Sequence, residues 1–334
     1  MEDEVKTQNF LPLNFYIDPL ATRHSPLATR HSPLTTHHSP LTTHHSPLTT
    51  RHSPLTTRHS PLTPSITNVR VKQLFIHPVK GLTPQAQERV FLQAGHGIPG
   101  DRAFALMYDD VAFRDEILAA STSIPWMKKQ NFAMQADWAA LAALDCQYDP
   151  QTGMLTVKRQ GVELLVASCD TPNGRLEIGA FFTGYLAAIY PSQTARHPNR
   201  APLKLVGSST GKTRYSDREP VHLSLIGQAT LDRLEASVGK SIDVRRFRPN
   251  VLLEEVPPWA EFDWVGQEIQ LGTARLEITA PINRCLNIDV NPDTGERDIP
   301  LLSLLQKHFD RKQTGVLAKV IADGTVAIGD RLIK

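Results

Sequence analysis

The sequence predicts a mainly β protein with a few helices, of the α+β class. In residues 69–76, the side chains of Val69, Val71, Gln73 and Phe75 would share one side of an extended chain, which predicts a strand with one well-buried face. Further short apolar stretches, each bounded by Gly, Pro, Asp or Asn, recur along the chain, and helical patterns are few. Short strands at such spacing are typical of a small sheet or barrel.

Before this strand, residues 1–68 are predicted to be a disordered tail. From Arg23 to Leu62 a seven-residue unit recurs, in which His-Ser-Pro-Leu appears six times. The proline in every unit would cost a helix interior about 3 kcal/mol, which argues against a coiled coil. One leucine per unit buries too little surface to offset backbone ordering of about 1–2 kcal/mol per residue. An expanded repeat read through as protein explains the tract better than metal binding by its eight histidines or a targeting peptide.

Strands are predicted wherever a short apolar stretch ends at a turn-forming residue. The first of them, at 69–76, ends at the segment 77–81, which reads His-Pro-Val-Lys-Gly. Further strands are expected at 88–92, 103–108, 155–157, 163–166, 203–206, 251–254, 268–271, 276–279, 317–321 and 325–328.

Helices are predicted in four places. Residues 223–238 have the clearest pattern, because three apolar side chains near the end of this segment share a face and Gly239 supplies a stop. A short helix is expected at 301–309, directly after a proline, and two more at 138–144 and 181–189.

Three prolines between 191 and 202 mark a boundary between two parts of the chain. We therefore expect a smaller β-rich domain at 69–195 and a second domain at 203–334. Without the tail, which holds five of the 36 basic and four of the 34 acidic residues, the net charge changes from +2 to near +1. A protein that binds the nucleic-acid backbone normally shows a basic excess, so no nucleic-acid partner is expected.

The three cysteines, Cys146, Cys169 and Cys285, are odd in number and far apart in the sequence. This argues against a disulfide framework and for a reducing compartment. The sequence has no CxxC motif, so it encodes neither a structural zinc site nor a cysteine-bound iron–sulfur cluster. No apolar run reaches the roughly 18 residues of a membrane span. We expect a cytoplasmic protein, with organelle targeting through the tail as the alternative.

Four short segments, 77–80, 97–102, 245–250 and 280–285, place a cation or a soft ligand at the end of a predicted strand. Taken singly, each has a purely structural explanation. Asp101 and Arg102 would form a surface ion pair worth about 0–1 kcal/mol, and the basic run in 245–250 would be solvated. Cys285 would be a small buried hydrophobe. Only the combination of the four points to chemistry.

Seven motifs resemble the MOSC superfamily, in particular its two-part members with an N-terminal β-barrel domain before the MOSC domain itself. That group includes the mitochondrial amidoxime-reducing components and their bacterial relatives. The motifs are HPVKG (77–81), GIPGDR (97–102), YSD (215–217), RFRPN (246–250), NRC (283–285), DVNPDTG (289–295) and VAIGD (326–330). They span about 69–334, and their order is more specific than any one of them. The resemblance implies a β-barrel-like domain at 203–334.

The resemblance also implies a pyranopterin cofactor, Mo-molybdopterin, whose molybdenum takes the thiolate of Cys285 as a ligand. Molybdenum held by a dithiolene accepts a soft thiolate readily, and the charge of Arg284 beside Cys285 favours that form. The phosphate and the pterin edge need fixed donors. By family analogy these come from Lys80, Arg102, Tyr215, Ser216, Arg248, Asn250 and Arg284. Pyridoxal phosphate binding also belongs to the general description of the family, and we give it only at that level.

The implied activity is that of an oxidoreductase that reduces small N-hydroxylated or N-oxygenated compounds. Because the chain has no iron–sulfur motif, electrons would come from a separate ferredoxin- or flavin-type donor. Two alternatives remain open: a sulfur carrier with a persulfide on Cys285 for metallocluster assembly, and a non-catalytic module that binds or stores cofactor. Gly81, where the amidoxime reducers usually have serine, and residues 128–132 depart from the family pattern, which leaves the substrate open.

Overall fold

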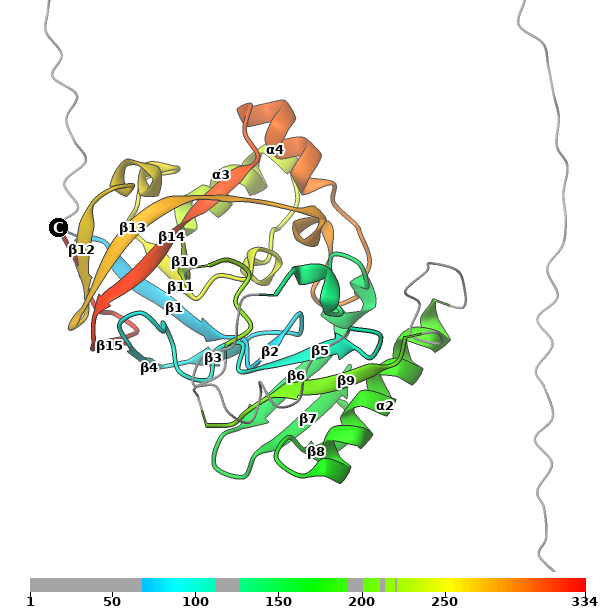
Figure 1. Ribbon diagram of the computed structural model, residues 1–334. Helices are drawn as coiled ribbons and strands as arrows, with labels where there is room; N and C mark the ends of the chain where they lie inside the picture. Colours follow the sequence, from blue (N-terminus) through cyan, green and yellow to red (C-terminus); the bar gives the residue numbers. More distant parts are fainter. Residues whose placement is uncertain (1–67, 112–126, 191–200, 211–213, 220) are drawn as a thin grey trace, which may run out of the picture. The chain divides into compact units, whose positions relative to one another are not determined.

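The computed structural model describes residues 68–111, 127–190, 201–210, 214–219 and 221–334. The predicted disordered tail at 1–68, which includes the repeat tract, lies outside these ranges apart from Asn68. Within them the protein consists mostly of strands with three α-helices, labelled α2, α3 and α4, so the predicted α+β class is confirmed (Figure 1).

The largest described sheet has eight strands and is curled, and β13 and β14 are long neighbouring strands within it (Figure 1). Its order is β16-β12-β13-β14-β10-β11-β1-β3, and each pairing is antiparallel except that of β10 with β11. The strands are β1 (Arg70–Ile76), β3 (Gln85–Gln87), β10 (Leu223–Gly227), β11 (Val251–Glu254), β12 (Glu268–Leu271), β13 (Ala274–Asn283), β14 (Gln313–Ala322) and β16 (Leu332–Ile333).

The parallel pair β10–β11 corrects one of the predicted helices. The helix α3 begins at Gln228 and ends at Val238, whereas residues 223–227 form strand β10. Leu223 and Leu225 are fully buried in the sheet, where β10 pairs with both β14 and β11. Pairing with strands distant in sequence overrides the local helical pattern. The predicted stop is confirmed, because Gly239 takes the left-handed conformation with φ +70°.

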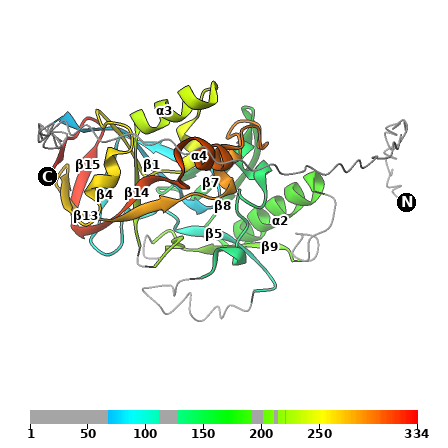
Figure 2. The same cartoon turned by 90° about the horizontal axis from the view of Figure 1, so that it is seen from above.

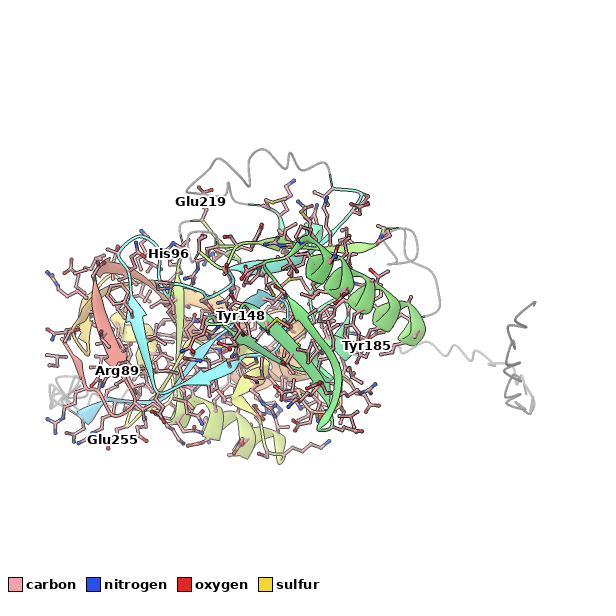
Figure 3. The ribbon with its side chains drawn as sticks, turned by 90° about the horizontal axis from the view of Figure 1, so that it is seen from below. Arg89, His96, Tyr148, Tyr185, Glu219 and Glu255 are labelled. Atoms are coloured by element: carbon pink, nitrogen blue, oxygen red, sulfur yellow. The ribbon has the colours of Figure 1, made fainter. Side chains whose placement is uncertain are left out.

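The described residues also form three smaller sheets. Strand β4 (Arg89–Leu92) pairs with β15 (Gly324–Ala327), and β2 (Val79–Lys80), β5 (Phe104–Tyr108) and β9 (Leu203–Gly207) form a second unit. The third contains β6 (Asp145–Asp149), β7 (Met154–Arg159) and β8 (Val162–Ser168). Seen from below in Figure 3, Tyr148 lies in this third sheet and Tyr185 lies on helix α2.

Helix α2 (Pro172–Ile189) is longer than the predicted helix, which began at residue 181. Thr171 caps it by accepting a hydrogen bond from the backbone N–H of Gly174, and proline occupies its first turn. Helix α4 (Leu301–Phe309) has the predicted bounds, and it lies near α3 in Figure 2. The segment predicted as helix at 138–144 is the shorter 3-10 helix η3 (Ala139–Ala143). Other 3-10 helices are η2 (Lys129–Asn131), η4 (Val244–Phe247), η5 (Ala260–Trp264) and η6 (Leu286–Asp289).

Two large apolar clusters form the core. One lies against the eight-stranded sheet and includes Leu225 and Leu276, whereas the other joins β5–β9 to α2 through Phe104 and Phe182. Cys146 and Cys169 are buried in the second cluster, and burial raises the pKa of each thiol to about 12. Both therefore pack as apolar side chains.

The first strand of the predicted N-terminal domain is part of the sheet that contains β10–β14, because β1 pairs with β11 over Arg70–Glu254 and Leu74–Val251. The boundaries at 69–195 and 203–334 stay predictions. In the part of the chain that the structure describes, no helix has both the length and the apolar character needed to cross a membrane.

Candidate functional site

A pocket of about 430 Å³ collects the predicted site residues from distant parts of the sequence. This volume is within the usual range of small-molecule and cofactor sites. Six of the eight predicted residues line it: Arg102, Ser216, Arg248, Asn250, Arg284 and Cys285. The other two, Lys80 and Tyr215, are buried and are not on the described lining.

Cys285 stands on the pocket lining directly after strand β13, at the start of η6. Its side chain is exposed and free of any disulfide. The far end of η6 is anchored, because Ile288 is buried and the carboxylate of Asp289 accepts a hydrogen bond from the backbone N–H of Leu302 at 2.9 Å. Helix η6 is thus held in the protein interior at one end, while the thiol of Cys285 at its other end is accessible.

Arg284 fastens this cysteine to its surroundings. Its guanidinium donates to the Thr314 Oγ1 at 2.6 Å and to the Phe247 carbonyl oxygen at 2.8 Å, and it lies over the Phe247 ring at 5.3 Å from the centroid. Burial lowers the pKa of Arg284 to about 9. Arg284 therefore connects the Cys285 loop to β14 and η4, and only part of its donor capacity is left for a ligand.

Asp101 is a buried hub behind the lining. Its Oδ2 accepts hydrogen bonds from Arg102 at 2.5 Å and Arg214 at 2.9 Å, and its Oδ1 accepts one from the backbone N–H of His77 at 2.7 Å. Burial raises the pKa of Asp101, but the two guanidinium groups outweigh it and hold that pKa well below its usual range. Gly97 permits this packing, since its φ is +90° and a Cβ there would lie 2.4 Å from the Arg214 Nη1.

Lys80 holds the segment 215–217 in place. Its ammonium donates to the carbonyl oxygens of Tyr215 at 3.1 Å and Ser216 at 3.2 Å, and to the carboxylate of Asp217. These acceptors account for its three N–H groups. Burial lowers the pKa of Lys80 and Asp217 opposes that shift. The contact between Lys80 and a cofactor phosphate stays a prediction.

Asp217 is the second carboxylate of this network. Burial raises its pKa, but the charges of Lys80 and Arg102 outweigh that effect and leave the pKa below its usual range. Its Oδ2 lies 3.8 Å from the Nε of Arg102. The half-exposed Asp217 therefore remains ionised and orders two cations.

Arg248 is the cation with the most donors left over. It has a left-handed backbone, with φ +50°, at the end of η4. Its guanidinium donates to the carbonyl oxygen of Leu82, and among the described residues it forms no ion pair with a carboxylate. Burial, followed by the charge of Arg102, lowers the pKa of Arg248 to about 10. A guanidinium has five N–H donors, so most of those on Arg248 are available to an anion.

Asn250 joins two strands at the edge of the pocket. Its Nδ2 donates to the Phe75 carbonyl oxygen at 3.2 Å, and its Oδ1 accepts a hydrogen bond from the Ser224 backbone N–H at 3.2 Å. These bonds connect β1 to β10. The amide keeps one N–H, which is all that it has left for a ligand.

Tyr215 and Ser216 also serve the fold. The Tyr215 ring is 3% exposed and packs edge-on against Phe132, with 5.4 Å between centroids. Its buried hydroxyl has no hydrogen-bond partner among the described residues. Ser216 donates its hydroxyl proton to the carbonyl oxygen of Arg218 at 2.7 Å. The structure therefore places Ser216 on the lining and the Tyr215 ring in an apolar cluster.

The sequence reasoning missed three residues that organise the pocket: Asp101, Arg214 and Asp217. Asp101 stands inside the motif GIPGDR and Asp217 inside the motif YSD. Both could have been predicted, because a buried arginine or lysine requires a counter-ion. Arg214 has no such signal, because it lies outside these motifs in a segment without regular secondary structure. Its ion pair with Asp101 at 2.9 Å identifies it.

The loop after Cys285, which contains the motif DVNPDTG, is bound on both sides. Arg245 donates to Asp293 at 2.7 Å, and Arg246 forms an ion pair with Asp298 at 2.8 Å. Gly295 packs so closely on η3 that a Cβ would lie 2.8 Å from the Cα of Ala140. The motif therefore attaches the Cys285 wall of the pocket to the 134–143 region.

His77 gives a prediction about the pH dependence of stability. It is fully buried, and burial, followed by the charge of Arg248, lowers its pKa to about 3. Below its unfolded pKa of 6.5, the unfolded chain binds a proton that the folded protein excludes, so stability falls as the pH decreases. At pH 5 this amounts to about 2 kcal/mol relative to pH 7.

We therefore expect the free energy of unfolding of wild type, measured in urea, to fall by about 2 kcal/mol more than that of His77→Gln when the pH is lowered from 7 to 5. The exposed His308 provides the control, because His308→Gln should retain the wild-type pH dependence. Equal pH dependence in wild type and His77→Gln would contradict the assignment of His77 as a neutral buried side chain.

The donor set of the pocket fits an anionic organic cofactor that carries a soft metal. An accessible thiol suits such a metal, and guanidinium groups suit phosphate. Basic side chains outnumber carboxylates on the described lining, which includes seven Lys and Arg residues but, of the acidic residues, Asp137 and Asp217. This excess of positive charge suits an anionic ligand. Among the described residues, no group of three His, Cys, Asp or Glu side chains is placed to hold a metal ion.

Residues 210–333 match the family model for the MOSC domain. The chain is 26% identical over 275 residues to a molybdenum cofactor sulfurase of Anopheles gambiae, which covers 76% of this chain but only 34% of that relative. It is 23% identical over 243 residues to mitochondrial amidoxime-reducing component 1 of Mus musculus, which covers 70% of each. The YUAD protein of Bacillus subtilis aligns structurally with a TM-score of 0.39 and 13% identity, over 79% of this chain and 93% of that one.

Proposed function

We propose that this chain, which carries a MOSC domain at residues 210–333, binds a pyranopterin molybdenum cofactor and reduces N-hydroxylated compounds with it. The observation that carries the proposal is the accessible thiol of Cys285 on a pocket that also contains the guanidinium of Arg248, most of whose donors are unused among the described residues. The amidoxime-reducing relative supports the choice of reaction. Mo-molybdopterin is the proposed cofactor.

In this proposal the thiolate of Cys285 is a metal ligand, and Arg284 keeps its loop on β14 and η4. Arg248 and Arg102 donate to the phosphate and the pterin edge, since both line the pocket. Asp101 positions Arg102 and Arg214, and Lys80 positions the 215–217 segment. Asn250 and Ser216 offer the few donors that they do not use within the fold.

The reaction breaks the N–O bond of a hydroxylamine, an N-hydroxylated base or an amidoxime. Two electrons and two protons enter, the nitrogen is left as N–H, and the oxygen leaves as water. The bound cofactor supplies the two-electron redox chemistry, and the protein supplies binding, orientation and charge. The reductant is a separate ferredoxin- or flavin-type protein.

A sulfur carrier is the second candidate. It is favoured by the relative named molybdenum cofactor sulfurase, and by the exposure of Cys285, which leaves room for a persulfide. A non-catalytic module that binds or stores the cofactor is the third. It requires the same cationic pocket but no turnover.

Metal and pterin analysis separates these candidates. The full chain is purified from a host that makes the cofactor, and molybdenum, oxidised pterin fluorescence and sulfane sulfur are measured together with reduction of benzamidoxime by a ferredoxin-type reductant. Stoichiometric molybdenum with turnover is the expected result. Sulfane sulfur without molybdenum would establish the carrier, and bound cofactor without turnover of any N-hydroxylated compound would establish storage. The absence of any pterin would overturn the proposed function.

A further inference from the structure

One carboxylate of the pocket has no partner within the described part of the chain. Asp137 is exposed on the lining, and among the described residues its side chain takes part in no hydrogen bond or ion pair. The other lining carboxylate, Asp217, is already bound by Lys80 and lies 3.8 Å from Arg102. An unpaired carboxylate within an otherwise cationic pocket is available to a ligand that carries N–H donors.

A chain of contacts places Asp137 at the Cys285 end of the pocket. Val290, one residue beyond η6, forms a β-bridge with Arg297. The guanidinium of Arg297 in turn donates to the carbonyl oxygen of Ala136, the residue before Asp137. The segment that carries Asp137 is thus bonded directly to the loop that follows Cys285.

The segment is also rigid on its other side. The indole Nε1 of Trp138 donates to the Tyr108 hydroxyl at 2.5 Å, and its ring packs edge-on against Tyr190 at 5.2 Å. The backbone N–H of Asp137 donates to the Met134 carbonyl oxygen at 3.0 Å. These contacts hold the backbone of Asp137, which limits the positions that its carboxylate can take on the lining.

The surroundings of Asp137 suit a ligand with an apolar body. Met134 and Ala136 stand on the lining beside it, and Ile282, Ile288 and Leu317 add apolar surface from the Cys285 side and from β14. An amidoxime or an N-hydroxyguanidine combines an apolar substituent with N–H groups next to the N–O bond. Its reduced product is an amidinium or guanidinium, which a carboxylate binds through two parallel N–H bonds.

We infer that Asp137 is the specificity-determining residue of this site: its carboxylate accepts N–H groups from N-hydroxylated amidines and guanidines and so favours them over N-oxides that have none. The inference rests on the proposed function for the reaction itself. The inference assigns the selection for N–H donors to Asp137, and it applies equally to an amidinium, which is not reduced.

The first test compares two substrates in the cofactor-loaded full chain. For Asp137→Asn we expect the KM for benzamidoxime to rise about tenfold, the size expected for losing a partly exposed charged hydrogen bond, with kcat changed less than twofold. The KM for pyridine N-oxide, which has no N–H group, should not change. Asp263→Asn is the matched control, because Asp263 is exposed and lies away from the lining.

The second test measures binding without turnover. Calorimetric titration of the full chain with benzamidine should show a dissociation constant about tenfold weaker for Asp137→Asn than for wild type and Asp263→Asn. Unchanged benzamidine affinity in Asp137→Asn, no binding to wild type, or an equal loss for pyridine N-oxide would overturn the inference. A protein without molybdenum would overturn the proposed reaction. The benzamidine measurement would still test the role of Asp137, because binding of benzamidine needs no redox step.

Discussion

Cys285→Ser is expected to abolish molybdenum binding in the full chain while changing the free energy of unfolding by no more than about 0.5 kcal/mol. The side chain is exposed, so its replacement removes little packing. Serine offers a hard hydroxyl that stays protonated at neutral pH, whereas the proposed metal site needs a soft thiolate. The large effect on metal content and the small effect on stability follow from the same exposed position.

Molybdenum measured by mass spectrometry and unfolding in urea test the two halves of this expectation. The buried cysteine of β6 provides the control, because Cys146→Ser should lower stability by about 1–3 kcal/mol through burial of a hydroxyl whose acceptor, the Leu144 carbonyl oxygen, lies 3.9 Å from the present sulfur. It should leave the metal content of the folded protein unchanged. Full metal occupancy in Cys285→Ser would show that the thiol is not a ligand.

Asp101→Asn is expected to destabilise the protein by about 3–5 kcal/mol, as removal of one partner from a buried ionic cluster does. Asp101 is fully buried and its two arginines, Arg102 and Arg214, are 10% and 3% exposed, so water cannot replace the lost charge. An amide in its place offers one acceptor oxygen where the carboxylate offers two. The other atom would be an NH₂ group that faces a guanidinium or the backbone N–H of His77.

Urea unfolding at pH 7 measures this loss, with Asp109→Asn as the control. Asp109 is 62% exposed and forms an ion pair with Lys204 at 3.4 Å, so its replacement should cost about 0–1 kcal/mol. Because the folded pKa of Asp101 lies below its unfolded value of 3.8, its contribution is present above that pH and is lost as the pH falls through the folded value. The difference between wild type and Asp101→Asn should therefore shrink below pH 4. An equal loss in the free energy of unfolding for Asp101→Asn and Asp109→Asn would contradict the role of Asp101 as the shared partner of two buried arginines.

Local patterns predicted the elements that depend on local interactions. Helix α4 has the predicted bounds because its start after a proline and its apolar face are encoded within nine residues. The segment of strand β10 was predicted as helix, because its apolar residues run directly into the helical pattern that follows. Its pairing with β14 and β11 makes it a strand. Helix α2 begins before its apolar pattern does, at a threonine cap and a proline.

The sequence by itself determined the fold class and the order of the motifs. It also determined which residue types form the site, because Cys285 follows a predicted strand and Arg102 and Arg248 stand near predicted turns. These features follow from short-range pattern and from family resemblance. Only the tertiary structure decided how the charges are shared: Asp101 binds two arginines, and Lys80 donates to residues 215–217. Among the described residues, Arg248 keeps most of its donors and Asp137 keeps its carboxylate oxygens for a ligand. The reason is physical, because ion pairs and hydrogen bonds of this site join residues that are up to 166 positions apart in the chain.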